Sequence, residues 1–242
     1  MEPRARRTLL LQLAALGVWT CGGSRQAGSD ARPVETPRAM PRIVCLGDSL
    51  TAGYGLEPQE SWPVLIQERL RQKGYDYELV NAGVSADTSA DGLRRLEWSL
   101  DGDVRILILA LGANDGLRGL SVRELKRNLV AMVTAAQARD LRVLLVGMEI
   151  PPNLGPEYAG GFRQVFHDVA KERRVAGFLP FLLDGIAGQA RFNQGDSIHP
   201  NALGTRMVAE NVWQALEPML GQATLTALTP SPSPRGRGGA AR

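Results

Sequence analysis

Residues 106–116 read ILILALGANDG, an unbroken apolar run that ends abruptly in small and polar residues. A strand buried on both faces has this character, because its side chains do not alternate between apolar and polar. Four further runs are typical of strands in the same sheet: residues 42–46, 77–80, 143–148 and 178–179. The sequence therefore predicts a sheet whose strands are covered on both sides.

Stretches with apolar residues at helical spacing lie between these runs. Helices are expected to begin after the capping residues Ser61, Thr88, Ser121 (in a capping box with Glu124) and Asn201, and a further helix over 158–174. The last helix is expected to bury Leu203, Met207, Val208, Val212 and Leu216. Strands that alternate with helices indicate a parallel sheet. We therefore expect one α/β domain over residues 42–220, a three-layer doubly wound fold with a parallel, flavodoxin-like sheet of five strands.

The composition is that of a globular protein, with 44% hydrophobic and 22% charged residues in 242. It excludes a disordered chain, a collagen, a coiled coil and a disulfide scaffold. Residues 41–220 carry 19 Arg and Lys against 22 Asp and Glu, so the basic excess belongs to the two ends. We expect no nucleic-acid partner, because such a partner needs basic residues clustered on a folded face. No metal or other cofactor is expected, because no ligand cluster or phosphate-binding loop occurs.

The N-terminal end is typical of an export signal. Three arginines in the first seven residues precede a mainly apolar stretch, 8–20, which is shorter than the roughly 20 residues of a transmembrane helix. We interpret residues 1–20 as a signal peptide. Cys21 follows directly, as in bacterial lipoproteins, and is a candidate lipidation site; simple secretion and an uncleaved start are the alternatives. The expected location is the periplasm, or a membrane to which a lipid on Cys21 anchors the protein.

The segments that flank the predicted domain are expected to be unstructured. Residues 22–41 are rich in Gly, Ser, Ala, Pro and Arg and are interpreted as a flexible linker. Residues 221–242 have few large apolar side chains, which are needed to offset the entropy lost on ordering, and are interpreted as a disordered tail. A monomer is favoured for the protein as a whole.

Polar residues follow the predicted strands, where ligands of parallel sheets bind. Ser49 follows the first strand and Asn114 the central one. A serine hydroxyl needs a base to become a nucleophile, and neutral histidine can serve near pH 7. His167 lies within a predicted helix, whereas His199 lies in a loop with Asp196 three residues earlier. That spacing allows the carboxylate to reach the imidazole Nδ1–H and leaves Nε2 free to act on Ser49.

A reaction of this kind also needs donors for the oxyanion of its tetrahedral intermediate. The backbone N–H of Ser49, the backbone N–H of Ala86 and the side-chain amide of Asn114 are the candidates. Three blocks carry a family resemblance: GDSLTAGYGL at 47–56, GANDGLRG at 112–119 and DSIHPN at 196–201. The chain resembles the GDSL, or SGNH, hydrolases, named for a Ser, a Gly, an Asn and a His in four separated blocks.

The resemblance implies specific roles for these residues. Ser49 would be the nucleophile, His199 the base and Asp196 the group that orients it, with Asn114 and two backbone N–H groups as the oxyanion hole. Within the family the chain is most similar to the secreted multifunctional thioesterase, arylesterase and lysophospholipase type. One block departs from the pattern, because Ala86 stands where the family usually has glycine. If the loop requires a positive φ, alanine is strained there by about 1 kcal/mol or more and its N–H is less well aimed.

We therefore expect a serine esterase or thioesterase that hydrolyses carboxylic esters or thioesters, including aryl esters, acyl thioesters and lysophospholipids, through an acyl-enzyme. The candidates to line its acyl pocket are Tyr54, Leu56, Leu117, Pro151 and Leu154. Two alternatives remain open at this point. One is a carbohydrate O-deacetylase of the same fold, and the other is a non-catalytic, flavodoxin-like binding lipoprotein, since fold alone does not determine function.

Overall fold

The computed structural model describes residues 40–221. The strands are β1 (Arg42–Gly47), β2 (Glu78–Gly83), β3 (Val104–Ala110), β4 (Arg142–Val146) and β5 (Gly177–Leu179). The α-helices are α1 (Ser49–Ala52), α2 (Trp62–Gln72), α3 (Ser89–Ser99), α4 (Ala113–Leu117), α5 (Val122–Gln137), α6 (Pro156–Arg173) and α7 (Ala202–Leu216). Short 3₁₀ turns are η1 (Pro58–Glu60), η2 (Pro152–Leu154) and η3 (Glu217–Met219). The predictions for residues 1–20, Cys21, most of 22–41 and 222–242 lie outside the described residues.

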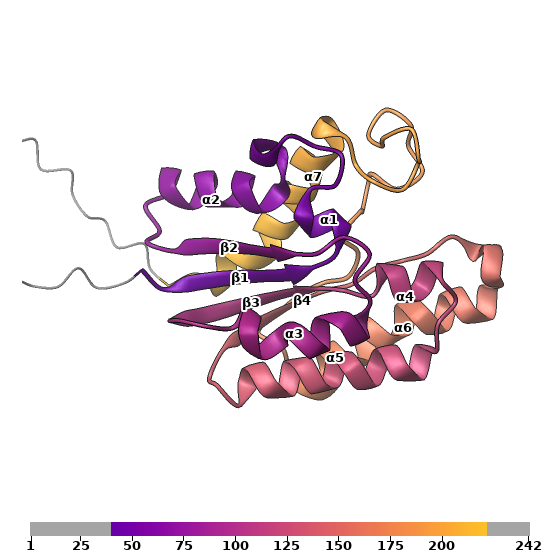
Figure 1. The fold of residues 1–242 in the computed structure, drawn as a ribbon, viewed down its shortest axis with the longest axis horizontal. Coiled ribbons are helices and arrows are strands. Elements are labelled where there is room, and N and C mark those ends of the chain that lie inside the picture. The colour runs from indigo at the N-terminus through magenta and orange to yellow at the C-terminus, as the bar shows by residue number, and fades with distance from the viewer. Residues whose placement is uncertain (1–39, 222–242) are drawn as a thin grey trace, which may run out of the picture. The chain divides into compact units, whose positions relative to one another are not determined.

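The five strands form one parallel sheet in the order β2-β1-β3-β4-β5. Figure 1 shows α2 and α7 on one face of this sheet and α3, α5 and α6 on the other. This is the three-layer, flavodoxin-like α/β fold that the alternation of strands and helices predicts. Because all strands run the same way, the loops that follow β1, β2 and β3 meet at one edge of the sheet.

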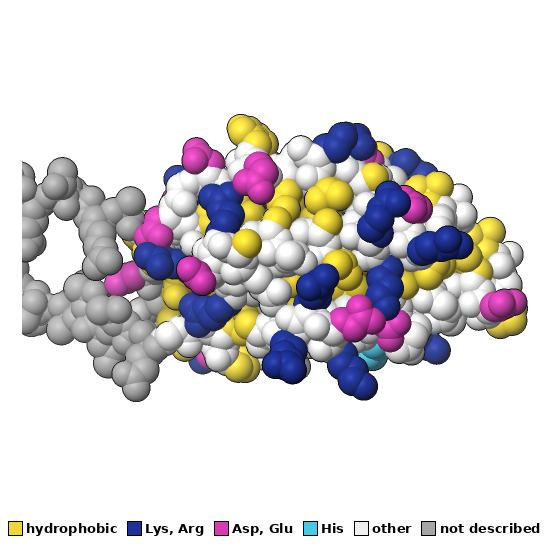
Figure 2. Space-filling model, turned by 90° about the horizontal axis from the view of Figure 1, so that it is seen from below, with side chains coloured by type: hydrophobic (Ala, Val, Ile, Leu, Met, Phe, Trp, Pro, Cys, Tyr) yellow, Lys and Arg dark blue, Asp and Glu magenta, His cyan; other side chains and the backbone are white. Residues whose placement is uncertain are grey.

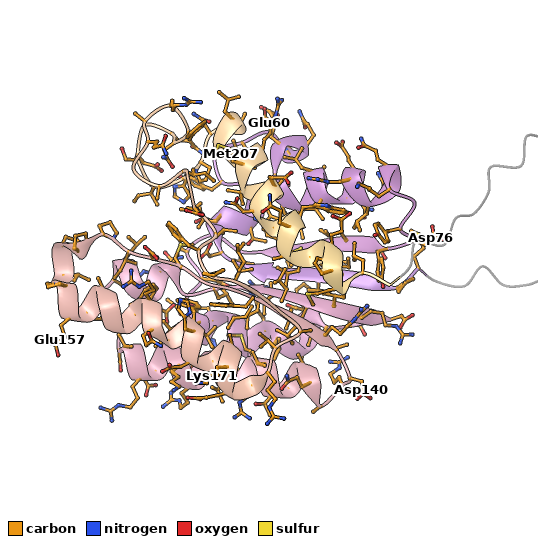
Figure 3. All side chains as sticks on the ribbon, turned by 180° about the vertical axis from the view of Figure 1, so that it is seen from behind. Glu60, Asp76, Asp140, Glu157, Lys171 and Met207 are labelled. Atoms are coloured by element: carbon orange, nitrogen blue, oxygen red, sulfur yellow. The ribbon has the colours of Figure 1, made fainter. Side chains whose placement is uncertain are left out.

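The two ends of the sheet can be followed in Figure 3. Asp76, just before β2, and Asp140, just before β4, lie toward the end opposite Glu157, which is in the first turn of α6 after β4. The carboxyl ends of the strands therefore face the Glu157 end, and the loops that bear Ser49 and Asn114 belong to it.

The core lies on both faces of the sheet. Residues 106–109 of β3 and 43–46 of β1 are essentially inaccessible to solvent, which confirms that these strands are covered on both sides. Trp62 of α2 and Trp213 of α7 fill the layer above them. Cys45 is a buried free thiol in β1, and burial raises the pKa of that thiol well above its ordinary value. It therefore serves as a small hydrophobic side chain.

Three predictions of detail are wrong. Ser61 stands directly before α2, but its hydroxyl donates to the Pro58 carbonyl at 3.2 Å instead of capping the helix. The Ser121 hydroxyl accepts from the Glu124 N–H at 3.3 Å, but the Glu124 carboxylate pairs with Arg127 instead of returning to Ser121, so only half of the capping box forms. Leu203 is 58% exposed rather than buried. At about 100° per residue it lies about 140° around the helix from Val208, which faces the core.

The surface over α3, α5 and α6 carries acidic and basic side chains interspersed with each other, as Figure 2 shows from that side. Over residues 40–221, no helix is both long enough and apolar enough to cross a membrane.

Candidate active site

Ser49 lies in the sharp turn that leads from β1 into α1. Asp48 caps this four-residue helix, and its Oδ1 accepts from the Leu50 N–H at 3.0 Å. Gly53, with φ of 83°, ends the helix one turn later. As the first helical residue, Ser49 keeps its own N–H free of intrahelical bonding. Ser49 is half-buried at the carboxyl edge of the sheet.

His199 and Asp196 meet Ser49 from the loop that precedes α7. The Ser49 Oγ lies 2.9 Å from His199 Nε2, and His199 Nδ1 lies 2.6 Å from Asp196 Oδ2. With Nδ1–H donating to the carboxylate, Nε2 presents its lone pair to the serine hydroxyl. Ser197, with φ of 61°, supplies the tight turn that brings Asp196 back onto His199.

Asp196 is held in its ionised form by hydrogen bonds. Its Oδ1 accepts from the backbone N–H of His199 at 3.0 Å and of Ile198 at 2.9 Å. The bond from the His199 backbone N–H is the largest cause that lowers the pKa of the Asp196 carboxyl to about 2. A carboxylate so held remains charged throughout the usual assay range, and its charge stabilises a protonated imidazole beside it.

The loop of residues 84–88 follows β2 and brings Ala86 to the same place. The Asp87 N–H donates to the Val84 carbonyl at 3.2 Å, which closes a four-residue turn with Ala86 third. Ala86 has φ of 71°. The third position of a type II turn requires positive φ and for that reason usually takes glycine. The condition for backbone strain at Ala86 is therefore met.

Asn114 enters the site from α4, just after β3. Its Nδ2 donates to the Asp87 carbonyl at 3.0 Å, which leaves one amide hydrogen for another acceptor. Just after the same short helix, the Arg118 guanidinium donates to the Ala86 carbonyl at 2.9 Å. Gly112 precedes the helix with φ of 123°, where a Cβ would lie within 3.1 Å of Phe166 and Leu125.

Asp48 is a buried carboxyl group directly before Ser49 in the sequence. It is 1% exposed, and its Oδ2 has no hydrogen-bond partner within the described residues. Burial raises the pKa of the Asp48 carboxyl to about 6, against the lowering effect of the bond from Leu50. No sequence pattern indicates this burial, because a GDSL tetrapeptide does not reveal how deeply its aspartate lies.

Two adjoining cavities open beside Ser49. The first, of 260 Å³, is lined by Ser49, Leu50, Tyr54, Ser85, Ala86, Ala113, Asn114, Leu117, Ile198 and His199. The second, of 180 Å³, shares Leu50, Ala113, Leu117 and Ile198 with the first and continues between Met148, Ile150, Pro151, Phe181 and Leu183. Its lining is mainly apolar, as an acyl chain requires.

The five residues expected to line an acyl pocket are distributed unevenly. Tyr54 and Leu117 line the first cavity, and Leu117 and Pro151 line the second. Leu56 and Leu154 line neither of these two. The Tyr54 ring also packs against the His199 imidazole, with ring centroids 4.7 Å apart.

Sequence reasoning missed two side chains that brace the site. Gln194 donates to the Tyr54 carbonyl at 2.7 Å and to the Pro200 carbonyl at 3.0 Å, which ties the segment after α1 to the histidine loop. Arg95 bridges β1 and the 84–88 loop. Neither bridge has a local sequence signal, since each joins a nearby partner to a distant one: Gln194 bonds Tyr54 across 140 residues and Arg95 bonds Gly47 across 48. His167 lies away from the site on α6, where its ring packs against Phe178.

Known proteins are similar in sequence to the part of the chain that builds this edge of the sheet. The model of the GDSL-like lipase/acylhydrolase family matches residues 45–207. The chain is 41% identical over 183 residues to esterase TesA of Pseudomonas aeruginosa, an alignment that covers 75% of this chain and 90% of that one. It is 32% identical over 183 residues to thioesterase 1/protease 1/lysophospholipase L1 of Escherichia coli K12, covering 75% and 86%. A crystal structure of TesA matches with a TM-score of 0.72 and 40% identity, over 74% of this chain and 99% of that one.

The matched range begins in β1 and ends in α7, so it includes every loop that contributes to the site. The family model covers more than half of the sequence, and both relatives exceed 30% identity. The chain therefore belongs to the GDSL-like lipase/acylhydrolase family and is a serine carboxylic ester hydrolase.

Proposed function

We propose that Ser49 is the nucleophile of this hydrolase, with His199 as its general base and Asp196 as the group that orients the base. The observation that carries the proposal is the continuous chain of hydrogen bonds from Ser49 Oγ through both imidazole nitrogens to Asp196 Oδ2. Such a chain gives a serine hydroxyl a proton acceptor at the moment of attack.

The reaction then has two halves. Ser49 Oγ bonds to the acyl carbon while its proton passes to His199 Nε2. The tetrahedral intermediate collapses, the bond to the alcohol or thiol breaks, and that leaving group takes the proton. Water next attacks the acyl-enzyme with His199 again as base, the carboxylic acid departs, and Ser49 recovers its proton.

The oxyanion formed in each half needs donors in place before it appears. We assign this role to the backbone N–H groups of Ser49 and Ala86 and to the free hydrogen of the Asn114 amide. All three residues line the 260 Å³ cavity together with His199. The proposed nucleophile, base and oxyanion donors thus all belong to the lining of a single cavity.

The substrate proposed is a carboxylic ester or thioester with an acyl chain longer than acetyl. The apolar 180 Å³ cavity continues from the one at Ser49 and gives such a chain a place to bury its methylenes, each worth about 0.8 kcal/mol. The names of the relatives support the range of head groups: esters, acyl thioesters and lysophospholipids. An acetyl group on a sugar would leave the second cavity unused.

The test is hydrolysis of p-nitrophenyl butyrate by the full chain beside Ser49→Ala. We expect turnover by the parent and a loss of kcat of at least about 10³-fold in the variant, with unchanged melting temperature. Lys171→Ala, at the far end of α6, is the control and should match the parent. Equal turnover by Ser49→Ala and the parent would refute Ser49 as nucleophile. A series of acyl lengths against an acetylated sugar then tests the substrate class.

A further inference from the structure

Arg95 of α3 contacts two separate segments of the site with one guanidinium group. Its Nε donates to Asp87 Oδ2 at 2.6 Å, and its Nη2 donates to the Gly47 carbonyl at 2.8 Å. Gly47 ends β1 two residues before Ser49, and Asp87 directly follows Ala86 in the 84–88 loop. One side chain therefore joins the strand that carries Ser49 to the loop that carries Ala86.

The contacts of Arg95 with Asp87 and Gly47 are strengthened by burial and by a neighbouring backbone hydrogen bond. The side chains of Arg95 and Asp87 are only 17% and 13% exposed, so their ion pair is largely shielded from water and from salt. The Gly47 carbonyl also accepts from the Val84 N–H at 3.0 Å, so the start of the loop and Arg95 meet on the same oxygen. Arginine suits this position because its planar fork presents several donors at fixed angles.

The loop needs such support because Ala86 holds a positive φ that an L-residue resists. The other side chains that bond the loop near Ala86 are Asn114 of α4, which donates to the Asp87 carbonyl, and the exposed Arg118 just after α4, which donates to the Ala86 carbonyl. Within the described residues, Arg95 is the side chain that bonds both this loop and β1. An alanine free to relax would turn its N–H away from the site.

We propose that Arg95 is a positioning residue for the oxyanion hole, holding the Ala86 N–H at its working distance from Ser49 through the paired contacts with Asp87 and Gly47. The inference rests on the proposed function of Ser49 and Ala86. Arg95 lines neither cavity beside Ser49, so it acts through the loop and not on the substrate.

The proposal predicts where the kinetic effect falls. The oxyanion exists only in the transition state and the intermediate, so a misplaced donor lowers kcat and leaves KM nearly unchanged. Removing one oxyanion donor lowers kcat about 10²–10³-fold. A donor that is displaced but still present lowers kcat by less. A residue that served only the stability of α3 would alter the melting temperature without this split.

The first experiment compares Arg95→Lys with the matched control Arg94→Lys, using p-nitrophenyl butyrate. Lysine keeps the charge opposite Asp87 but cannot donate to both partners with a fork. We expect Arg95→Lys to lower kcat about 10–100-fold with KM within about twofold. Arg94, on the exposed side of α3 with a side chain 71% exposed, should give parental kinetics. Parental kcat in a folded Arg95→Lys would overturn the proposal.

The second experiment measures Arg95→Lys again in an Ala86→Gly background. Glycine adopts the positive φ without penalty, so the loop then depends less on Arg95. We expect Arg95→Lys to lower kcat by about fivefold less in the Ala86→Gly background than in the parent. That factor corresponds to the backbone strain that glycine removes at position 86. An equal or larger cost beside Gly would show that Arg95 does not act on the strained loop.

Two safeguards keep the outcomes distinct. If the parent itself fails to turn over, the proposed function fails; if the parent turns over and Arg95→Lys matches it, only the role of Arg95 fails. If Arg95→Lys does not fold, Asp87→Asn takes its place in both experiments, because it keeps the shape of the carboxylate and removes its charge. The same split between kcat and KM then supports the proposal, and its absence refutes it.

Discussion

At the scale of single residues, the buried carboxyl group of Asp48 lowers the stability of the folded protein at neutral and alkaline pH. This carboxyl is buried next to Ser49, and burial raises its pKa from 3.8 to about 6. The folded protein therefore binds this proton more tightly than the unfolded chain. Stability from this source is fully present below about pH 4 and is lost as the pH rises through about 6.

Asp48→Asn, which is neutral at every pH and has nearly the same shape, should remove this loss. The shift corresponds to roughly 2–3 kcal/mol, or about 4–10 °C in melting temperature for a protein of this size. We expect Asp48→Asn to melt above the parent at pH 8 and level with it at pH 4. Exposed Asp76→Asn is the control and should show no pH-dependent difference. A variant that melts below the parent at pH 8 would mean that the carboxylate is stabilised where it lies.

Whether a site residue can be predicted depends on how far its partners lie along the chain. Asp196 and His199 are three residues apart, and Ser49 and Asn114 each follow a strand whose end lies at the same edge of the sheet. Their proximity follows from a parallel sheet, while their roles remain proposals. Arg95 is different, because its bond to Gly47 joins residues 48 apart, and Gln194 bonds Tyr54 across 140 residues. No local pattern encodes such pairs.

At the scale of elements, a buried polar network holds three helices in register near the site. Asp115 of α4 accepts from the Ser89 N–H at 2.7 Å and from the Ser89 hydroxyl at 2.6 Å, at the start of α3. Asn128 of α5 donates to the same hydroxyl at 2.9 Å. All three side chains are almost fully buried. The network fixes α4, and with it Asn114, against the loop that precedes α3.

Ser89→Ala should therefore be costly despite the loss of one small oxygen. It leaves a carboxylate oxygen of Asp115 and the amide of Asn128 without a partner away from water, at about 2–4 kcal/mol. We expect a fall in melting temperature of roughly 5–12 °C. Thr134→Ala on α5, whose hydroxyl only bonds back to its own helix, should change little. Equal melting temperatures for the two variants would contradict a supporting role for the network.

The helices and strands that the sequence predicts best are the long and the deeply buried ones. The strands of the core are recognisable as apolar runs, and α5 and α6 are long enough to show a helical repeat of apolar residues. The helices α1 and α4 have four and five residues, which span little more than one turn and carry no repeat, so the sequence does not predict them. The apolar residues after Asn201 predict that Leu203 is buried with Val208, but its angle around α7 points it to solvent.

At the scale of the whole molecule, net charge differs between the predicted domain and the rest of the chain. Residues 41–220 have a net charge of −3 and the remainder +6. The hydrogen-bonded residues Ser49, His199 and Asp196, the candidate oxyanion donors and both cavities all lie within residues 40–221. We infer that catalysis belongs to this part, while the export signal and the Cys21 anchor proposed from the sequence determine location.

This separation predicts that location and activity change independently. Expressed in a bacterium, the parent should sediment with membranes, whereas Cys21→Ser and a chain of residues 40–221 should remain in the soluble fraction. All three should hydrolyse p-nitrophenyl butyrate with kcat/KM within about twofold of one another, because the side chains proposed for catalysis and the lining of both cavities come from residues 40–221. Ser24→Ala, three residues along the predicted linker, is the control and should stay with the membranes. If the parent and Cys21→Ser are found in the same fraction, a lipid anchor on Cys21 is refuted. A loss of tenfold or more in kcat/KM for residues 40–221 would instead show that a flanking segment contributes to the site.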